Sequence, residues 1–225
     1  ILGGVSAEMG NNNANDMTTP DDFNDILTAN LPAAYPKGYN AFYCMKYEIS
    51  QGQYAGFLDK LTPVQAATRY TSYSTFRYTI LNNAGAYTAA VPDRACNFLR
   101  WEDDAAYADW AGLRPMTELE YEKACRGAAA PAAQGEYAWA TDTRIGDSNG
   151  TIDVTSPEDG TEVNTTSTAL GAVVYGNNFI NVGGVPSAVG PVRCGLFATA
   201  DSTRITSGAT YWGIMEMCGN VFEQI

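Results

Sequence analysis

The chain begins with a polar stretch and then shows its first clear alternation of apolar and polar positions. Residues 1–35 are rich in Asn, Asp, Thr and Ala, so we expect an irregular N-terminal arm there. In FYCMKYEI, residues 42–49, every second residue from Tyr43 to Ile49 is apolar. This period of two places these side chains on one face and predicts a strand.

Directly after this strand the spacing of apolar residues becomes that of a helix. Ser50 can cap the helix, and Gln53 can complete a capping box with it. Pro63, which follows Thr62, suits the first turn of a second helix over residues 63–70. The apolar face of the first helix consists of Tyr54, Phe57, Leu58 and Leu61.

A hairpin and a third helix are predicted next. Residues 71–95 have the composition of strands and turns, with Asn-Ala-Gly at residues 83–85 as the reversal. Residues 101–112 predict a helix that ends at Gly112. Its expected apolar stripe consists of Trp101, Ala105, Ala108 and Ala111.

The fourth predicted helix covers residues 117–127, where Thr117 and Glu120 form a second capping box. After Gly127 the chain consists mostly of turn-forming residues and short β-like runs. Helices early in the chain and short strands with long loops later indicate an α+β fold. Loops this long in a compact domain are usually functional, or need something to hold them in place.

The net charge and the lack of histidine limit the partners and the kinds of catalysis that are open to this chain. The chain has 13 Lys and Arg against 25 Asp and Glu, a net charge of -12, so we expect no nucleic-acid partner. It contains no histidine, which excludes Ser-His-Asp hydrolases, zinc hydrolases and iron oxygenases with two histidine ligands for this stretch. The carboxylate and carbonyl oxygens that remain suit calcium or magnesium.

Cysteine usage and overall composition bear on the compartment. The cysteines form no Cys-x-x-Cys pair, which argues against a zinc knuckle and a thioredoxin-like motif. Few lysines and many Asn, Thr, Gly and Tyr residues predict an extracellular, periplasmic or cell-surface protein. No apolar run approaches the roughly 20 residues that span a bilayer, so we expect no membrane-spanning segment. The five cysteines are Cys44, Cys96, Cys125, Cys194 and Cys218.

Three stretches, in this order, resemble one known family. They are FYCMKYEISQGQYAGFL (42–58), WEDDAAYADWAGLRPMTELEYEKACRG (101–127) and GIMEMCGNVFE (213–223). Together they resemble the formylglycine-generating, sulfatase-modifying-factor family. The resemblance implies a variant of the C-type-lectin-like fold over residues 36–225, with little regular structure, two helices against a small twisted sheet, and long loops.

The catalytic members of that family bind copper through a cysteine pair in a segment that follows a Gly-Asn-Val-Trp-Glu turn. The matching turn here is CGNVFEQI, and the chain ends with it. None of the five cysteines matches a catalytic position, so copper is expected only if further sequence supplies the pair. We therefore expect the domain to be incomplete at its C-terminus.

The resemblance also implies a structural calcium ion in the closing turn. The matching positions are Glu216 and Glu223, through their side chains, and Gly219 and Val221, through their carbonyl groups. Calcium accepts irregular oxygen geometry and can hold a loop that no regular ladder supports. In the alternative, Glu216 is a solvated loop residue and Glu223 accepts backbone N–H groups. The apolar neighbours would then form core, namely Met215, Met217, Val221 and Phe222.

Other candidate sites have simpler explanations. DSNGTID, residues 147–153, resembles half of a calcium loop but is better explained as an exposed turn. PEDGTE, residues 157–162, is interpreted as a charged turn. Trp101, Tyr107 and Trp110 could stack on a sugar, but their helical spacing favours packing.

Two functions remain open at this point. In the first, the chain is a non-catalytic module of this family, at a cell surface or envelope, that binds a protein or glycan partner or serves as a structural component. In the second, the complete protein oxidises a substrate cysteine to formylglycine in sulfatases with copper held by two thiolates. The absence of a matching cysteine pair favours the first.

Overall fold

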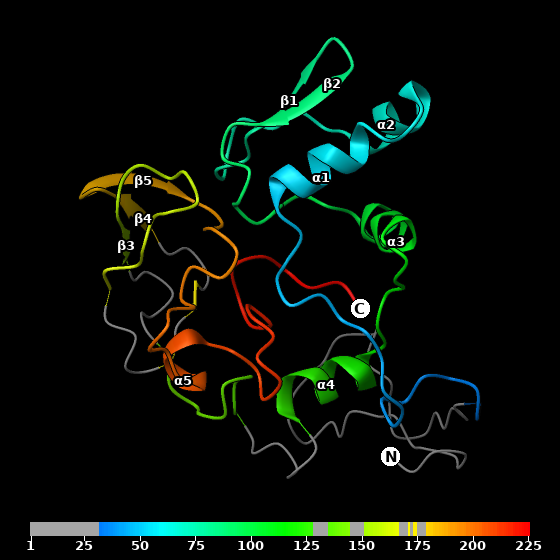
Figure 1. Cartoon of the computed structure of the whole chain (residues 1–225), viewed down its shortest axis with the longest axis vertical. Coiled ribbons are helices and arrows are strands. Elements are labelled where there is room, and N and C mark those ends of the chain that lie inside the picture. The colour runs from blue at the N-terminus through cyan, green and yellow to red at the C-terminus, as the bar shows by residue number, and fades with distance from the viewer. Residues whose placement is uncertain (1–31, 128–134, 145–150, 167–170, 172, 175–178) are drawn as a thin grey trace, which may run out of the picture.

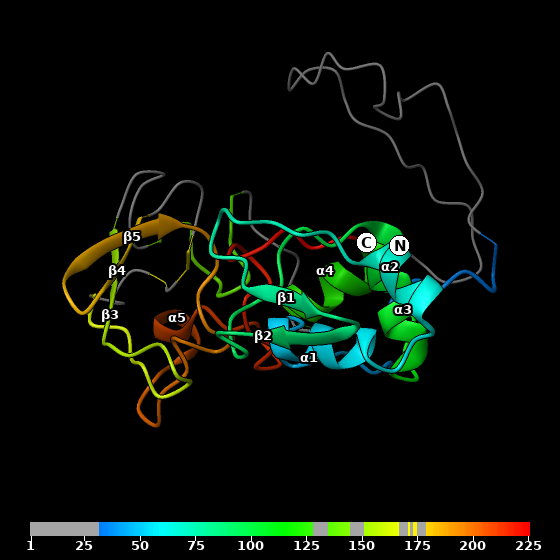
Figure 2. The same cartoon turned by 90° about the horizontal axis from the view of Figure 1, so that it is seen from above.

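The computed structural model describes residues 32–127, 135–144, 151–166, 171, 173–174 and 179–225. Short helices and strands are joined by long connections (Figure 1), which confirms the predicted α+β class. Seen from above, the helices α1 to α4 lie toward one end and the sheet of β3, β4 and β5 toward the other (Figure 2). Of the predicted arm, only residues 32–35 are among those described.

The first region combines three helices with a hairpin. The predicted capping box of Ser50 with Gln53 is present, and Thr62 forms another with Gln65 that was not predicted. The hairpin reverses at residues 84–85, as predicted, and its strands pair in antiparallel register. The elements are α1 (Gln51–Leu58), α2 (Pro63–Arg69), β1 (Ile80–Asn83), β2 (Ala86–Ala89) and α3 (Trp101–Trp110).

A largely aromatic core joins these elements. Tyr54, Phe57 and Leu58 of α1 are buried, as the periodicity predicts, and Phe57 packs edge-on against Tyr107 of α3 with ring centroids 5.5 Å apart. Tyr78, Ile80 and Tyr87 of the hairpin region belong to the same cluster.

The predicted stripe on α3 is wrong. Trp101 is 44% exposed and Ala111 is exposed, whereas Asp103 and Tyr107 are buried. Asp103 lies inside because it pairs with Arg69 (Nη1–Oδ1 3.3 Å) and Arg100 (Nε–Oδ2 3.0 Å). The face of α3 that lies against the core is therefore the one with Asp103 and Tyr107, and not the one that the apolar pattern predicts.

The predicted strand over residues 42–49 is also wrong. The segment is a connection, and Tyr43 is 93% exposed. Its backbone is bonded at single points, since Met215 N donates to Lys46 O (2.9 Å) and Cys96 N to Ile49 O (2.8 Å). An alternating pattern forms a strand only beside a partner strand, and here loops lie beside it.

The second region is built around α4 (Glu118–Arg126), a three-stranded sheet and α5 (Arg204–Ser207). The capping box of Thr117 and Glu120 is present, as predicted. In the sheet, β3 (Thr151–Val154) pairs parallel with β4 (Phe179–Val182), and β4 pairs antiparallel with β5 (Val185–Val189). Two smaller apolar clusters support it, one around Ile152 and Ile180 and one around Cys125 and Met217.

A buried ion network, here called the Glu158 network, joins the two regions. Glu158 pairs with Arg77 and with Arg94 (Nη2–Oε2 3.0 Å). Arg94 also donates from Nη1 to Arg77 O (2.6 Å), and Arg77 Nε donates to Pro191 O (2.9 Å). Glu158, in the predicted charged turn at residues 157–162, thus bonds across the molecule, whereas three residues of that turn are exposed.

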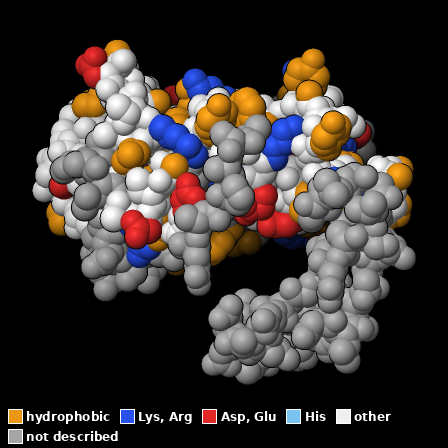
Figure 3. Space-filling view, turned by 90° about the horizontal axis from the view of Figure 1, so that it is seen from below, with side chains coloured by type: hydrophobic (Ala, Val, Ile, Leu, Met, Phe, Trp, Pro, Cys, Tyr) orange, Lys and Arg blue, Asp and Glu red, His pale blue; other side chains and the backbone are white. Residues whose placement is uncertain are grey.

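The face seen from below mixes hydrophobic, acidic and basic side chains, and no one kind dominates its described part (Figure 3). Among the described residues, no helix is both long and apolar enough to cross a membrane.

Candidate functional site in the closing turn

The closing segment, residues 213–225, runs through the middle of the molecule between the two regions (Figure 1). It bonds to both, because Gln224 Nε2 donates to Leu99 O (2.8 Å) and Asn220 N donates to Val174 O (2.7 Å). Tyr121 of α4 also donates its hydroxyl hydrogen to Met217 O. This placement makes the turn a link between all parts of the fold.

Glycine is required at the centre of the turn. Gly219 has φ +93°, and a Cβ there would lie 2.3 Å from Val174 O and 2.4 Å from Val173 Cγ2. Glu216 and Asn220 also adopt left-handed backbone conformations, with φ 57° and 66°. Such conformations cost of order 1–3 kcal/mol each in non-glycine residues and gather at functional sites.

The two predicted carboxylates are only partly satisfied. Glu216 is 8% exposed, and its Oε1 accepts a hydrogen bond from Gly195 N (2.7 Å). Its Oε2 and Glu223 Oε1 are buried and have no hydrogen-bond partner among the described residues. A buried polar atom without a partner costs about 1–3 kcal/mol, so a further partner at either oxygen would be stabilising.

A third carboxylate, Glu48, belongs to the site and was not predicted. It accepts hydrogen bonds from Val221 N (3.1 Å) and Asn220 Nδ2 (2.5 Å). Asn220 Oδ1 in turn accepts from Val192 N (2.8 Å). In the sequence, Glu48 stands out only as an acidic residue two positions before the helix cap Ser50. Its hydrogen-bond partners lie more than 170 positions later in the chain.

Burial raises the pKa of all three carboxylates, and neighbouring acidic charge adds to the rise for Glu223 and Glu48. Burial raises the pKa of Glu216 to about 7, and it raises the pKa of Glu223 to about 7, with a further rise from the charge of Glu216. Burial and the charge of Glu216 also raise the pKa of Glu48 well above its usual range. The site therefore attracts either protons or a cation.

The predicted calcium site stays a prediction. Glu216, Gly219, Val221 and Glu223 lie in one turn, and two of the carboxylate oxygens are unpartnered. The described residues contain no group of three or more Cys, Asp and Glu side chains arranged to hold a metal, so an ion here would depend on backbone carbonyls. Calcium accepts such mixed ligands, whereas magnesium demands near-octahedral geometry.

The apolar neighbours of the turn divide in two. Met215 and Met217 are buried, as expected, but Phe222 is 98% exposed. The expectation that Phe222 belongs to the core is therefore wrong. On either side of it the chain is bonded to the fold, since Val221 N donates to Glu48 Oε1 (3.1 Å) and the Gln224 side chain donates to Leu99 O (2.8 Å).

The cysteines do not fit a copper site. All five are free thiols. Burial raises the pKa of Cys125 to about 12 and also raises that of each other thiol, most strongly for Cys96 and Cys194. Copper and nucleophilic chemistry both require the thiolate, so these environments oppose both.

The remaining predicted candidates are structural or lie outside the described residues. Asp147 and Asn149 are outside them, while Asp153 lies in β3 and accepts a hydrogen bond from Asn181 Nδ2 (2.8 Å). Tyr107 is buried, and Trp110 packs against Phe57 at 5.5 Å, as the packing interpretation predicts.

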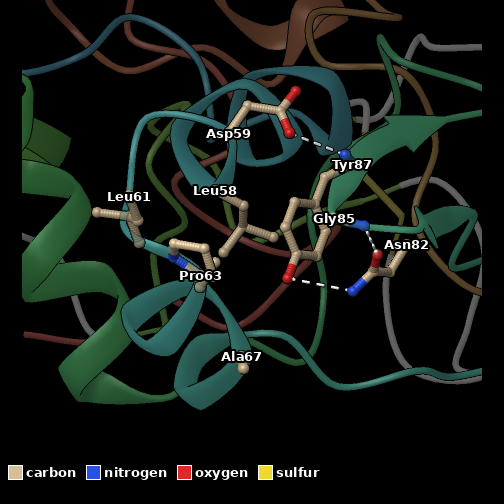
Figure 4. Close-up of a pocket in the computed structure, with 9 residues that line it drawn as sticks. Leu58, Asp59, Leu61, Pro63, Ala67, Asn82, Gly85 and Tyr87 are labelled. Carbon is tan, nitrogen blue, oxygen red and sulfur yellow. Dashed lines mark hydrogen bonds between the residues drawn. The ribbon is translucent and has the colours of Figure 1, made fainter.

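A small cavity of about 180 Å³ lies between α1, α2 and the hairpin (Figure 4). Its walls are mainly apolar, and its polar groups bond to each other. Asp59 Oδ1 accepts from Tyr87 N (2.8 Å), and Asn82 bonds to Gly85 N and to the Tyr87 hydroxyl. It offers no polar group arranged for chemistry.

The fold and the site together define an α+β domain with little regular structure, centred on a closing Gly-Asn-Val turn. A family model described as the sulfatase-modifying factor enzyme 1-like domain, FGE-sulfatase, matches residues 1–225. The chain therefore belongs to the FGE-sulfatase family, as its three sequence stretches indicate. Comparison with curated proteins gave no match, and comparison with solved structures gave none.

Proposed function

We propose that this chain is a non-catalytic module of the FGE-sulfatase family. It acts at an extracellular, periplasmic or cell-surface location, where it binds a protein or glycan partner or serves as a structural component. The observation that carries this proposal is the state of the cysteines. Every one of the five thiols has a raised pKa, which opposes the thiolate that copper-dependent oxidation needs.

A calcium ion in the closing turn is the second part of the proposal. Glu216 and Glu223 would bind it through side chains, and Gly219 and Val221 through carbonyl groups. The unpartnered oxygens Glu216 Oε2 and Glu223 Oε1 support this assignment. In this role calcium is structural, because it neutralises the clustered carboxylates and holds the segment that joins both regions.

Copper(I) titration tests the non-catalytic assignment. The chain competes for copper(I) with a chromogenic chelator, next to a variant in which all five cysteines are replaced by serine and whose folding is checked by circular dichroism. We expect no tight equivalent in the native chain, and slow alkylation of its thiols by iodoacetamide at pH 7.5 until it is unfolded. One tight equivalent that the variant lacks would overturn the proposal and favour the copper-dependent oxidase.

A further inference from the structure

Three exposed aromatic side chains gather where the connection from α2 to β1 meets the connection from β2 to α3. Tyr73 is 38% exposed, Phe76 52% and Phe98 40%. The rings of Tyr73 and Phe98 stack with centroids 4.0 Å apart and planes at 20°, and Phe76 meets Phe98 edge-on at 6.0 Å. The three side chains form one contiguous surface, here called the aromatic platform.

Buried neighbours support the aromatic platform. Buried Tyr78 packs edge-on against Tyr73 (5.6 Å) and Phe98 (6.0 Å) and joins both to the core. Asn97 Nδ2 donates to Phe76 O (2.9 Å), and Arg77 is anchored in the Glu158 network. The aromatic rings thus keep fixed positions although they face the solvent.

The backbone is strained to display these rings. Phe76, Arg77 and Phe98 have φ values of 50°, 64° and 63°, in a region that non-glycine residues adopt at a cost of order 1–3 kcal/mol each. Packing alone does not explain the strain, because two of these residues present aromatic rings to water. Strain that exposes apolar surface indicates a binding role.

The two segments that carry the platform are polar and contain no charged residue. Residues 71–76 read Thr-Ser-Tyr-Ser-Thr-Phe, and residues 97–98 are Asn-Phe. The arginines near these segments are held in ion pairs, since Arg77 bonds to Glu158 and Arg100 to Asp103. Flat aromatic faces interleaved with hydroxyl and amide groups complement a sugar ring, which has an apolar C–H face and a rim of hydroxyl groups.

Area and charge favour a small, neutral occupant. With about 200 Å² for each aromatic side chain, the platform exposes roughly 250 Å², a third of the roughly 800 Å² that each partner contributes to a standard protein interface. The net charge of -12 repels polyanions. A neutral glycan remains as the occupant that matches both the size and the charge.

We propose that Tyr73, Phe76 and Phe98 bind the flat faces of sugar rings in a neutral polysaccharide or glycan. This assignment rests on the proposed function as a binding module and names the class of its partner. It uses no residue of the closing turn, so it does not depend on calcium.

Affinity electrophoresis tests this proposal. The full chain runs in native gels cast with neutral hydroxyethyl cellulose or galactomannan, and in gels cast with anionic carboxymethyl cellulose. We expect retardation in at least one neutral gel, and loss of it in the variants Phe98→Ala and Phe76→Ser. Tyr43→Ala, which removes an exposed aromatic ring elsewhere, should keep the retardation. Thermal unfolding confirms that each variant is folded, and Phe76, the most exposed ring, is the safer substitution.

Three results would overturn the assignment. The first is free migration of the native chain in both neutral gels, and the second is equal retardation of the native chain and Phe76→Ser. The third is a dimer in light scattering that Phe76→Ser dissociates, which would make the platform a contact between copies of this chain. The proposed function fails separately, by tight copper(I) binding, whatever the gels show.

Discussion

Two buried polar sites, one in the first region and one in the closing turn, differ in how completely their hydrogen bonds are made. Gln51 is fully buried, and all of its bonds are made. Its Nε2 donates to Arg77 O (3.1 Å) and Ala95 O (3.3 Å), and its Oε1 accepts from Thr79 N (2.8 Å) and Thr79 Oγ1 (2.7 Å). Glu216, by contrast, keeps one buried oxygen without a partner.

The difference separates a buried polar group with all of its hydrogen bonds from one that lacks a bond. A buried amide with every bond made stabilises one arrangement of the chain. A buried carboxylate with an unmade bond is costly unless a proton or cation completes it. The same distinction applies to Glu158, whose two oxygens each meet an arginine. We expect substitutions at these sites to differ in their cost and in their response to calcium.

The largest effect is expected for the Glu158 network. Glu158→Ala leaves Arg77 and Arg94 buried without their carboxylate, which should lower the free energy of unfolding by about 3–5 kcal/mol. Urea unfolding measures this loss, with Glu102→Ala, an exposed acid in α3, as the control. A loss below about 1 kcal/mol, as for exposed ion pairs, would show that the network does not hold the two regions together.

The second effect concerns Gln51. Gln51→Leu keeps most of the volume but leaves Thr79 N and Ala95 O buried without their partner, and we expect a loss of about 3 kcal/mol. The loss should be the same with EDTA and with calcium, because the site is complete without a metal. A calcium-dependent loss in urea unfolding would contradict the separation of the two sites.

The third prediction concerns the closing turn and calcium. At calcium about a hundredfold above its dissociation constant, binding should stabilise the fold by about 2.7 kcal/mol, a rise in Tm of roughly 5–10 °C. EDTA should reverse the rise, and Glu223→Ala should abolish it, whereas Glu118→Ala, an exposed acid in α4, should not. A Tm of the native chain that responds to neither calcium nor EDTA would refute the site.

The pH dependence of Tm sharpens this prediction. The folded-state pKa of both Glu216 and Glu223 is about 7, above the ordinary value of 4.5. The folded state therefore holds these protons more tightly than the unfolded state, and the metal-free protein should lose stability as the pH rises from about 4.5 to about 7. Calcium should stabilise most above pH 7, where the carboxylates are charged. If the Tm of the metal-free protein rises between pH 4.5 and pH 7, the predicted direction of the pH dependence is wrong.

Several helices could be predicted from the sequence, because caps and periodicity act over a few residues. Ser50 with Gln53 and Thr117 with Glu120 begin their helices where the sequence places them. The strand over residues 42–49 could not be judged, because strand formation depends on a partner elsewhere in the chain. The orientation of α3 depends on Asp103 and its arginine partners, which an apolar pattern does not represent.

The candidate site was predictable only in part. The ligand positions in the closing turn follow from a local motif, so the resemblance identifies them. Glu48 bonds to Asn220, 172 positions away, and no local pattern indicates this contact. The ion pairs of Glu158, in the turn at residues 157–162, were missed for the same reason, since the arginine partners come from another region.

The smallest effect compares helix caps in the two regions. Ser50→Ala removes the cap of α1, whose buried face belongs to the aromatic core, and should cost about 1 kcal/mol in urea unfolding. Thr203→Ala removes the cap of α5, a helix of 4 residues. Arg204 holds that helix independently, because its Nη2 donates to Ala138 O (2.6 Å).

We therefore expect Thr203→Ala to cost less than about 0.5 kcal/mol, within the range of ordinary surface substitutions. In the background of Arg204→Ala, which removes the guanidinium, Thr203→Ala should cost more stability. A double-mutant cycle measures this coupling. Equal costs for the Ser50 and Thr203 substitutions, with no coupling to Arg204, would mean that both regions rely on local helix signals alike. A larger cost for Ser50→Ala, together with coupling in the second region, would mean that bonds from side chains to distant backbone replace helix caps where loops dominate.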